Sequence, residues 1–445
     1  MGGRLALALR VVLYVAVATW LLFLFAFQPY DAAQLRRVLL VSAACLVPLL
    51  AAVLYAWPRL SWLRRAYLVA ANLCALLLAA ELSARAAAWL RPGPLFVRPA
   101  SKAEARIEQY RGLPGENYFG VPLDARGYHD GPWQPAPGQP RIVAVGDSFS
   151  QGVVAHPFHY TTVAERLLGG IPIDNVGVSA IGPSEYLYLI EHEVLPAQPD
   201  VIVLALFLGN DVAEADRPPA SIGRSWYARE NVLLFQLPKR LWALWHEAQP
   251  RTRAAGHDFD PPLRVGDPPE RFVEWMPWLA DPLLESPTFT REAFLEIEKQ
   301  RLPQIFRADD RSAYRGLFRD LDRIRRATRG IDLRVLLIPT EVQVEPALWD
   351  EVVRYAAVVF PLDRDQPQRI VREWLARRGI AYADALPDFR AQAPLPDGRR
   401  HLYHLRDTHL NARGNAVLGH VLARLLEAPA PAVRPPADGA PGAPG

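Results

Sequence analysis

Asp200–Leu208 reads DVIVLALFL, a run in which every residue after the first is apolar. A strand in the middle of a parallel sheet is covered by helices on both faces, so such strands are continuously hydrophobic instead of alternating. We therefore predict that this stretch is a central strand and that the chain folds around a parallel sheet.

Shorter runs of similar character precede and follow this stretch, and segments with helical spacing lie between them. The other predicted strands are Arg141–Val145, Ile173–Val176, Leu333–Ile338 and Ile380–Ala383, and the amphipathic helices cover about 314–324, 366–378 and 412–427. Alternation of strands and helices predicts an α/β fold of three layers, with helices on both faces of a parallel sheet. Functional residues of such folds collect beyond the carboxyl ends of the strands.

The composition narrows the classes of protein. The 445 residues include 50 basic and 47 acidic side chains, a formal charge of +3, so no basic excess indicates a nucleic-acid partner. Two cysteines exclude a disulfide scaffold and a Cys-rich zinc module. The sequence has no H-E-x-x-H motif and no Gly-rich phosphate loop, so we expect no metal and no cofactor.

Three apolar runs open the chain. Val11–Phe27 and Leu39–Trp57 contain no charge, and Tyr67–Ala80 is a third run that ends before Glu81. About 20 apolar residues cross the roughly 30 Å hydrocarbon layer of a bilayer. The third run reaches this length if Glu81 lies near an interface or faces a partner helix. We predict a membrane anchor of three helices over residues 1–91, the alternative being soluble core helices.

The orientation of this anchor follows from the arginines of its short loops. Five arginines lie in the N-terminal segment and the second loop, and two lie in the first loop: Arg4, Arg10, Arg59, Arg64 and Arg65, against Arg36 and Arg37. Positive residues favour the cytoplasmic side. We therefore expect a multi-pass protein of the cell membrane whose main domain is periplasmic or otherwise extracytoplasmic; with two spans, that domain would face the cytoplasm.

Four further parts follow the anchor. Residues 92–138 are rich in Pro and Gly and are expected to form a loosely packed linker. Residues 139–427 carry the α/β pattern, interrupted by an insertion at about 212–310. Residues 428–445 have almost no large apolar group and are expected to be disordered.

The insertion is rich in tryptophan and leaves three interpretations open. The segment from Leu233 to Ala248 combines apolar residues with Lys239 and Arg240, as a lid or an interfacial helix on lipid headgroups would. An aromatic platform for sugar rings is a second interpretation. Ordinary core packing of the inserted element is the third.

The first and last turns of the α/β part carry a candidate acyl-transfer site. Gly146–Gly152 reads GDSFSQG, which presents Ser148 on the turn between a strand and a helix. Asp407 and His409 stand two residues apart before a helix, a spacing that permits the hydrogen bond that sets an imidazole tautomer. Each motif alone is also explained by an ordinary helix cap, and His401 and His404 compete with His409.

The middle strand ends supply possible hydrogen-bond donors. Gly177 follows the second strand and offers an unobstructed backbone amide, and Asn210 follows the third strand with a side-chain amide. Both residues could equally be plain turn residues. His156 and His159 follow the serine turn and are candidates for the lining of the pocket.

Together the four blocks resemble the SGNH (GDSL-type) hydrolase family over roughly residues 140–427. The resemblance implies that Ser148 is the nucleophile, His409 the base and Asp407 its orienting acid. It also implies an oxyanion hole made by the amides of Ser148 and Gly177 and the side chain of Asn210. Gly209 directly adjoins Asn210, whereas many members read G-x-N-D. Asp407 and His409 are closer than in the usual D-x-x-H, a spacing similar to membrane-anchored, polysaccharide O-acetylation branches.

The resulting functional prediction is a membrane-anchored serine esterase or O-acyltransferase. Its substrate would be an acyl ester, foremost acetyl, of an envelope carbohydrate or lipid. Hydrolysis and transfer share an acyl-enzyme, and a membrane O-acyltransferase as partner would favour transfer. The alternatives are a catalytically silent protein that binds glycans or assembles an envelope complex, and a lipid esterase with the insertion as a lid.

Overall fold

The computed structural model describes residues 102–131, 133–216 and 263–429, with scattered positions between 69 and 86. The first two predicted membrane spans, the insertion from 217 to 262 and the tail from 430 lie outside the described residues. In the described part of the chain, no helix combines the length and apolarity needed to cross a bilayer. One compact unit comprises residues 1–105 and 219–255, and a second comprises residues 106–218 and 256–445.

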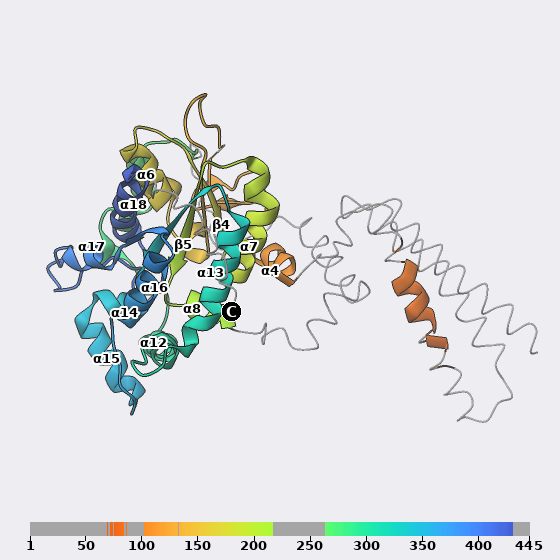
Figure 1. The fold of residues 1–445 in the computed structure, drawn as a ribbon. Coiled ribbons are helices and arrows are strands. Elements are labelled where there is room, and N and C mark those ends of the chain that lie inside the picture. Colours follow the sequence, from red (N-terminus) through yellow and green to blue (C-terminus); the bar gives the residue numbers. More distant parts are fainter. Residues whose placement is uncertain are drawn as a thin grey trace, which may run out of the picture. The chain divides into compact units, whose positions relative to one another are not determined.

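The second unit is built on a parallel sheet of five strands (Figure 1). In spatial order these are β4 (Ile173–Gly177), β3 (Ile142–Gly146), β5 (Val201–Phe207), β6 (Asp332–Ile338) and β7 (Ala381–Asp384). All neighbouring pairs run parallel. The predicted strands and the α/β class are therefore confirmed, with every predicted strand end within one residue of the observed one.

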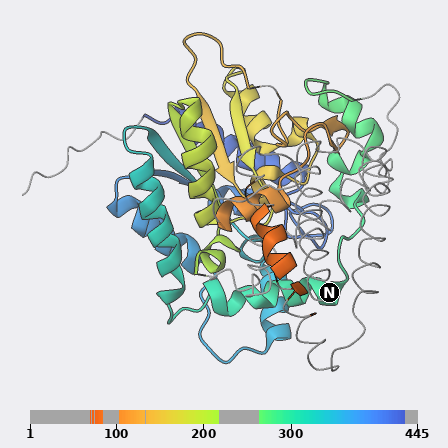
Figure 2. The ribbon, with the colours of Figure 1, turned by 90° about the vertical axis from the view of Figure 1, so that its right-hand side faces the viewer.

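Strand β5 accounts for the apolar run that predicted the sheet. Alternate residues of the strand enter two different hydrophobic cores, with Ile202, Leu204 and Leu206 in one and Val203, Ala205 and Phe207 in the other. The first core is covered by α7 (Pro183–Leu189) and α13 (Arg315–Ala327), and the second by α6 (Tyr160–Leu167) and α18 (Ala412–Glu427). Figure 1 shows these helix pairs on opposite sides of the sheet, and Figure 2 views the unit from the side of α7.

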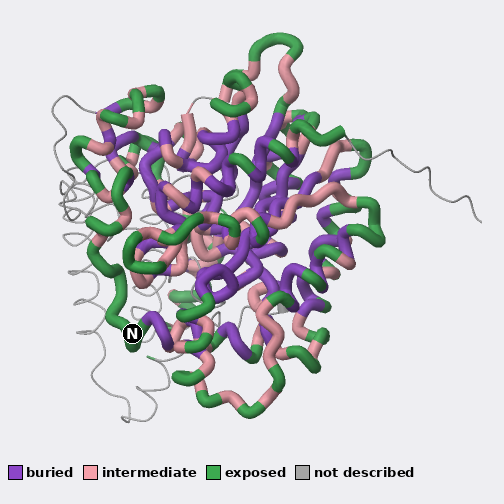
Figure 3. The backbone as a smooth tube through the Cα atoms, turned by 90° about the vertical axis from the view of Figure 1, so that its left-hand side faces the viewer, coloured by how far each residue is buried: buried purple, intermediate pink, exposed green. Residues whose placement is uncertain are grey.

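The remaining elements are short or lie at the periphery. Buried positions fill the interior of the unit, and exposed positions lie on the outer turns (Figure 3). These elements are α4 (Lys102–Tyr110), β1 (Asn117–Tyr118), β2 (Val121–Pro122), α5 (Ser148–Gln151), α8 (Asp211–Asp216), α11 (Pro269–Trp275), α12 (Arg291–Ile305), α14 (Glu341–Val344), α15 (Pro346–Ala356), α16 (Gln366–Arg377) and α17 (Leu386–Ala391). The predicted helices correspond to α13, α16 and α18.

Part of the predicted linker is an integral part of the domain. Ile107 and Tyr128 are fully buried in the first core. Strand β4 is an edge strand, and side chains cap its outward backbone amides: Ile173 donates to Glu165 (2.6 Å) and Asn175 to Asp130 (2.7 Å). An unpaired edge invites association with another chain, so covering it protects the fold.

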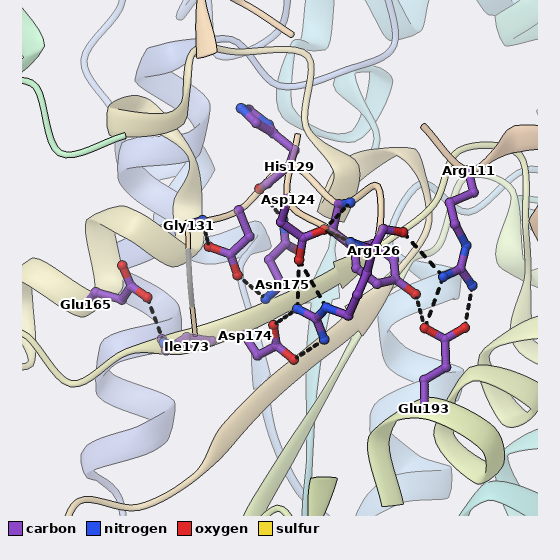
Figure 4. A network of polar contacts seen from close by, with 12 residues as sticks. Arg111, Asp124, Arg126, His129, Gly131, Glu165, Ile173, Asp174, Asn175 and Glu193 are labelled. Carbon is purple, nitrogen blue, oxygen red and sulfur yellow. Dashed lines mark hydrogen bonds and ion pairs between the residues drawn. The ribbon is translucent and has the colours of Figure 1, made fainter. Parts of the chain in front are cut away.

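An ionic network ties the same segment to β4 and to the helical turn Ile190–Val194 that follows α7 (Figure 4). Arg126 contacts the buried carboxylate of Asp174 with both terminal nitrogens, and Arg111 pairs with Glu193. We predicted a loosely packed linker over residues 92–138, but residues 106–131 pack firmly on the domain. Periodicity does not reveal this packing, because a segment that caps an edge has no regular apolar repeat.

The described end of the insertion packs as core. Phe294, Leu302 and Ile305 of α12 are buried in the first core, and Phe272 of α11 is buried in a third, smaller cluster with Val154. The buried residues of α11 and α12 therefore pack as core, whereas residues 280–293 are mostly exposed. The segment from Leu233 to Ala248, on which the lid interpretation depends, lies outside the described residues.

Candidate active site

The serine turn is fixed by Asp147 at the end of β3. Asp147 is fully buried and caps α5, since its Oδ1 accepts a hydrogen bond from the amide of Phe149 at 2.9 Å. Burial raises the pKa of Asp147, while hydrogen bonds from Phe149 and Asn210 oppose the rise. Helix α5 begins directly at Ser148, which lies at the carboxyl end of the sheet.

His409 brings an imidazole to this serine from the far end of the chain. Its Nε2 lies 2.9 Å from the Oγ of Ser148, and its Nδ1 lies 2.7 Å from Oδ1 of Asp407. A carboxylate accepts the Nδ1 proton, which leaves the lone pair of Nε2 free to accept the serine hydroxyl proton. Three residues predicted from two distant motifs therefore form one continuous line of hydrogen bonds.

The charge of Asp407 is maintained by its neighbours. Burial opposes ionisation, but the ring and backbone N–H groups of His409 outweigh it and lower the pKa of Asp407 to about 2. The backbone contribution is a bond of 3.1 Å from the amide of His409. Asp407 is therefore an ionised acceptor throughout the neutral range, as the tautomer of His409 requires.

Asn210 lies against the turn that carries the nucleophile. Its side-chain Nδ2 donates to Oδ2 of Asp147 at 3.0 Å, which leaves the second proton of the amide uncommitted. The preceding turn is tight, because a Cβ on Gly209 would lie 2.3 Å from the ring of Phe207. The side chain of Asn210 is therefore next to the residue that precedes Ser148.

Gly177 also meets the nucleophile segment, but as a packing residue. It pairs in register with Gly146, and a Cβ at Gly177 would lie 2.3 Å from the backbone nitrogen of Gln151 in α5. Glycine is required here because the backbone of α5 rests directly on the end of β4.

The amide of Gly177 points the wrong way for the predicted oxyanion hole. Val178 donates across the strand pair to the carbonyl of Gly146 at 3.2 Å, whereas Asn175 donates outward to Asp130. Because the amides of a strand alternate in direction, that of Gly177 also faces the outer edge, away from β3. The geometry therefore does not support Gly177 as an oxyanion donor.

Ala180, in the loop after β4, is a better candidate that the sequence did not reveal. Its φ of 58° is left-handed, and its carbonyl accepts from Nε of Arg106 at 2.6 Å. No described residue accepts a hydrogen bond from its amide, so this N–H is available as a donor. An alanine in a left-handed conformation has no sequence signature, because glycine or asparagine is the usual residue there.

His156 and His159 do not line the pocket. Both are buried, and their rings lie 5.7 and 5.8 Å from the ring of the equally buried His129. Burial, then the nearby His156, lowers the pKa of His129 to about 3, and burial likewise lowers that of His159 well below its ordinary value. Among described residues, no group of three potential ligands is arranged to hold a metal ion.

Comparison with known proteins found matches among solved structures. No family model matches the chain, and no curated protein is similar to it. The matching solved structures include a lipolytic protein of the G-D-S-L family from Desulfitobacterium hafniense DCB-2, 11% identical over 64% of this chain and 98% of that chain, with a TM-score of 0.28.

Acetylxylan esterases are also among these matches. A catalytic mutant of the acetylxylan esterase Axe2 from Geobacillus stearothermophilus is 13% identical over 68% of this chain and 100% of its own, with a TM-score of 0.31. The acetyl xylan esterase AlAXEase is 13% identical over 63% and 98%, with a TM-score of 0.30. These scores are low, so the chemistry of the site rests on its own geometry.

Proposed function

We propose that this protein is a membrane-anchored serine esterase or O-acyltransferase that acts on acyl esters, foremost acetyl, of an envelope carbohydrate or lipid. The observation that carries the proposal is the line of hydrogen bonds from Ser148 through His409 to Asp407. A serine hydroxyl is a weak nucleophile until an adjacent base takes its proton, and this arrangement provides that base.

The reaction follows from the positions of the protons. Ser148 Oγ attacks the ester carbonyl while Nε2 of His409 takes the hydroxyl proton, and the resulting imidazolium is stabilised by the ionised Asp407. His409 then returns the proton to the departing alcohol, which leaves an acyl-serine. Water releases the acyl group as an acid, or a sugar hydroxyl takes it up as a new ester.

Negative charge on the carbonyl oxygen needs hydrogen-bond donors. The uncommitted proton of Asn210 and the amides of Ser148 and Ala180 are the groups that support this part of the proposal. Donors of this kind stabilise the tetrahedral intermediate because they are already oriented before charge develops.

The envelope location rests on the apolar runs Val11–Phe27 and Leu39–Trp57 and on the arginines around them. An anchored domain outside the cytoplasm would meet esters of envelope carbohydrates and lipids. A membrane O-acyltransferase is the proposed partner if the acyl group is transferred. A reporter fused after Arg98 tests the orientation: activity outside the cytoplasm supports it, and activity inside reverses it.

The enzymatic proposal is tested with the full-length protein and a chromogenic acetyl ester. We expect the wild type to hydrolyse the ester and to bind a fluorophosphonate probe covalently, and Ser148→Ala to lose both properties. Ser150→Ala is the matched control, because the Oγ of Ser150 contacts the hydroxyl of Tyr160 instead of an imidazole. Equal hydrolysis by wild type and Ser148→Ala would eliminate Ser148 as the nucleophile.

A further inference from the structure

A second histidine–carboxylate pair lies in the loop that carries the catalytic base. His404 is buried, and both of its ring nitrogens are engaged. Its Nε2 lies 2.7 Å from the carbonyl oxygen of Val153, and its Nδ1 contacts the carboxylate of Glu285. Val153 follows α5 closely, and Glu285 belongs to the insertion, so one side chain joins three separate segments.

The partners of His404 indicate which protons it carries. A backbone carbonyl can only accept, so Nε2 must carry a proton to bond Val153. Glu285 already accepts the amide of Leu405 at 3.0 Å through Oε2, while Oε1 faces Nδ1. An ionised carboxylate also requires a donor at Nδ1, so the contacts are best satisfied by an imidazolium paired with Glu285.

The backbone of His404 holds the catalytic loop closed. Its amide donates to the carbonyl of His409 at 2.9 Å, and its carbonyl accepts from the amide of Asp407 at 3.0 Å. The amide of Thr288 in the insertion donates to the carbonyl of Leu405 at 3.0 Å. The loop is therefore fixed by its own hydrogen bonds and by the insertion.

His404 also acts on Asp407 through charge. After burial and the contacts with His409, the positive charge of His404 is a further cause that favours the ionised form and keeps the pKa of Asp407 low. The ionisable partners of His404 are Glu285 from the insertion and Asp407 from its own loop, which also contains Arg406 and His409. The segment after α5 contributes a carbonyl oxygen.

We propose that His404 and Glu285 form a positioning pair, which holds the acid–base loop against the nucleophile segment and supplies a positive charge beside Asp407. The inference rests on the proposed esterase function, and it assigns to the described end of the insertion a part in catalysis. His404 does not touch the substrate; it acts through Asp407 and His409.

The test compares four variants of the full-length protein: His404→Gln, Glu285→Gln, the double variant and Asp397→Asn. Asp397 is the matched control, since its carboxylate pairs with His401 in the same region without reaching the nucleophile segment. For each variant kcat and KM are measured against pH with the chromogenic ester, and a melting curve records folding.

We expect His404→Gln to lower kcat about tenfold to a hundredfold with little change in KM, because the base is misplaced relative to the serine. Loss of the positive charge, with Glu285 still negative, favours protonation of His409. The acid limb of the kcat/KM profile should therefore move to higher pH by about half a unit. The double variant, in which both charges are absent, should return the limb toward its original position, and Asp397→Asn should change neither quantity.

A pH profile unmoved by His404→Gln, or a loss of kcat no larger than that of Asp397→Asn, overturns the inference. If His404→Gln does not fold, Glu285→Gln carries the test: a loss of about tenfold in kcat supports the pair, and activity equal to Asp397→Asn overturns it. Failure of the proposed function is distinguishable, since the wild type itself would then show no hydrolysis dependent on Ser148.

Discussion

Histidines lie at both ends of the short helix α5. At its N-terminal end, His409 contacts the hydroxyl of Ser148. At its C-terminal end, Nδ1 of His129 contacts the carbonyl of Gln151 at 3.0 Å, and His159 packs against Gly152. The same type of side chain thus occurs in two opposite environments within one turn of helix.

The difference shows that partners and solvent determine what a histidine can do. The side chain of His409 is 25% exposed and has a carboxylate on one nitrogen and a hydroxyl on the other. His129 and His159 are fully buried, and no described group bonds their Nε2 atoms. Burial keeps His129 and His159 neutral, whereas the carboxylate lets His409 accept a proton.

The largest expected effect comes from removing that carboxylate. Asp407→Asn should lower kcat by about 10³–10⁴, because an asparagine amide at this position favours the wrong tautomer of His409. Initial rates with the acetyl ester measure the change, and the melting temperature should stay near that of the wild type. A loss of kcat below about tenfold would mean that Asp407 does not account for the difference between His409 and the buried histidines.

Asn210 distinguishes the two ends of α5 further, because its side chain supplies a hydrogen-bond donor only at the end that carries Ser148. Asn210→Ala should lower kcat by about 10²–10³ with a small change in KM, since the lost hydrogen bond forms to the transition state. Steady-state kinetics with the acetyl ester provide both constants. An effect confined to KM would instead indicate a substrate-binding role.

Packing at the opposite end of α5 is tested by Gly152→Ala. The added Cβ would lie 2.4 Å from the ring of His159, and φ at this position is 75°. We expect a loss of about 2–4 kcal/mol in the free energy of unfolding, from backbone strain and the clash together. Gly398→Ala is the control, since φ is 84° there and no atom lies within 4 Å. If urea unfolding gives equal losses of free energy for Gly152→Ala and Gly398→Ala, the clash with His159 contributes nothing.

The smallest expected effect at neutral pH concerns acid stability, because this effect develops only below pH 6.5. The pKa of His129 is about 3 in the folded protein and about 6.5 in the unfolded chain, so the unfolded chain binds the extra proton between these values. The free energy of unfolding should therefore fall with decreasing pH below 6.5, by up to about 1.4 kcal/mol per unit from this residue.

His129→Gln removes this titration and should flatten the dependence on pH. Urea unfolding at several pH values between 4 and 7 measures the slope. The exposed His420 provides the control variant, His420→Gln. Identical slopes for His129→Gln and the wild type would show that the buried histidine does not remain neutral.

Much of the fold could be predicted because it follows from local periodicity. The continuous apolar run of β5 reflects burial on two faces, and α13 and α18 each have a regular apolar stripe. The segment 106–131 escaped prediction because capping an edge strand takes individual polar contacts, such as Asp130 with Asn175. No repeat in a sequence encodes such contacts.

The same distinction between local pattern and tertiary contact applies to the residues of the candidate site. Ser148, Asp407 and His409 were predicted because short motifs fix their local geometry, and Asn210 because it ends a strand. Gly177 was misassigned as a donor, since the direction of a strand amide depends on which neighbour the strand pairs with. Ala180 was missed for want of a sequence signal.

The order of residues by itself determined the parallel sheet, the apolar runs at the N-terminus and the residue types able to perform acyl transfer. Only the tertiary structure decided that residues 261 positions apart share a hydrogen bond, and that His404 joins three segments while His156 lies in the interior. The physical reason is range. Hydrophobic periodicity acts over a few residues, whereas the proton affinity of an imidazole depends on burial and on charges contributed by distant parts of the chain.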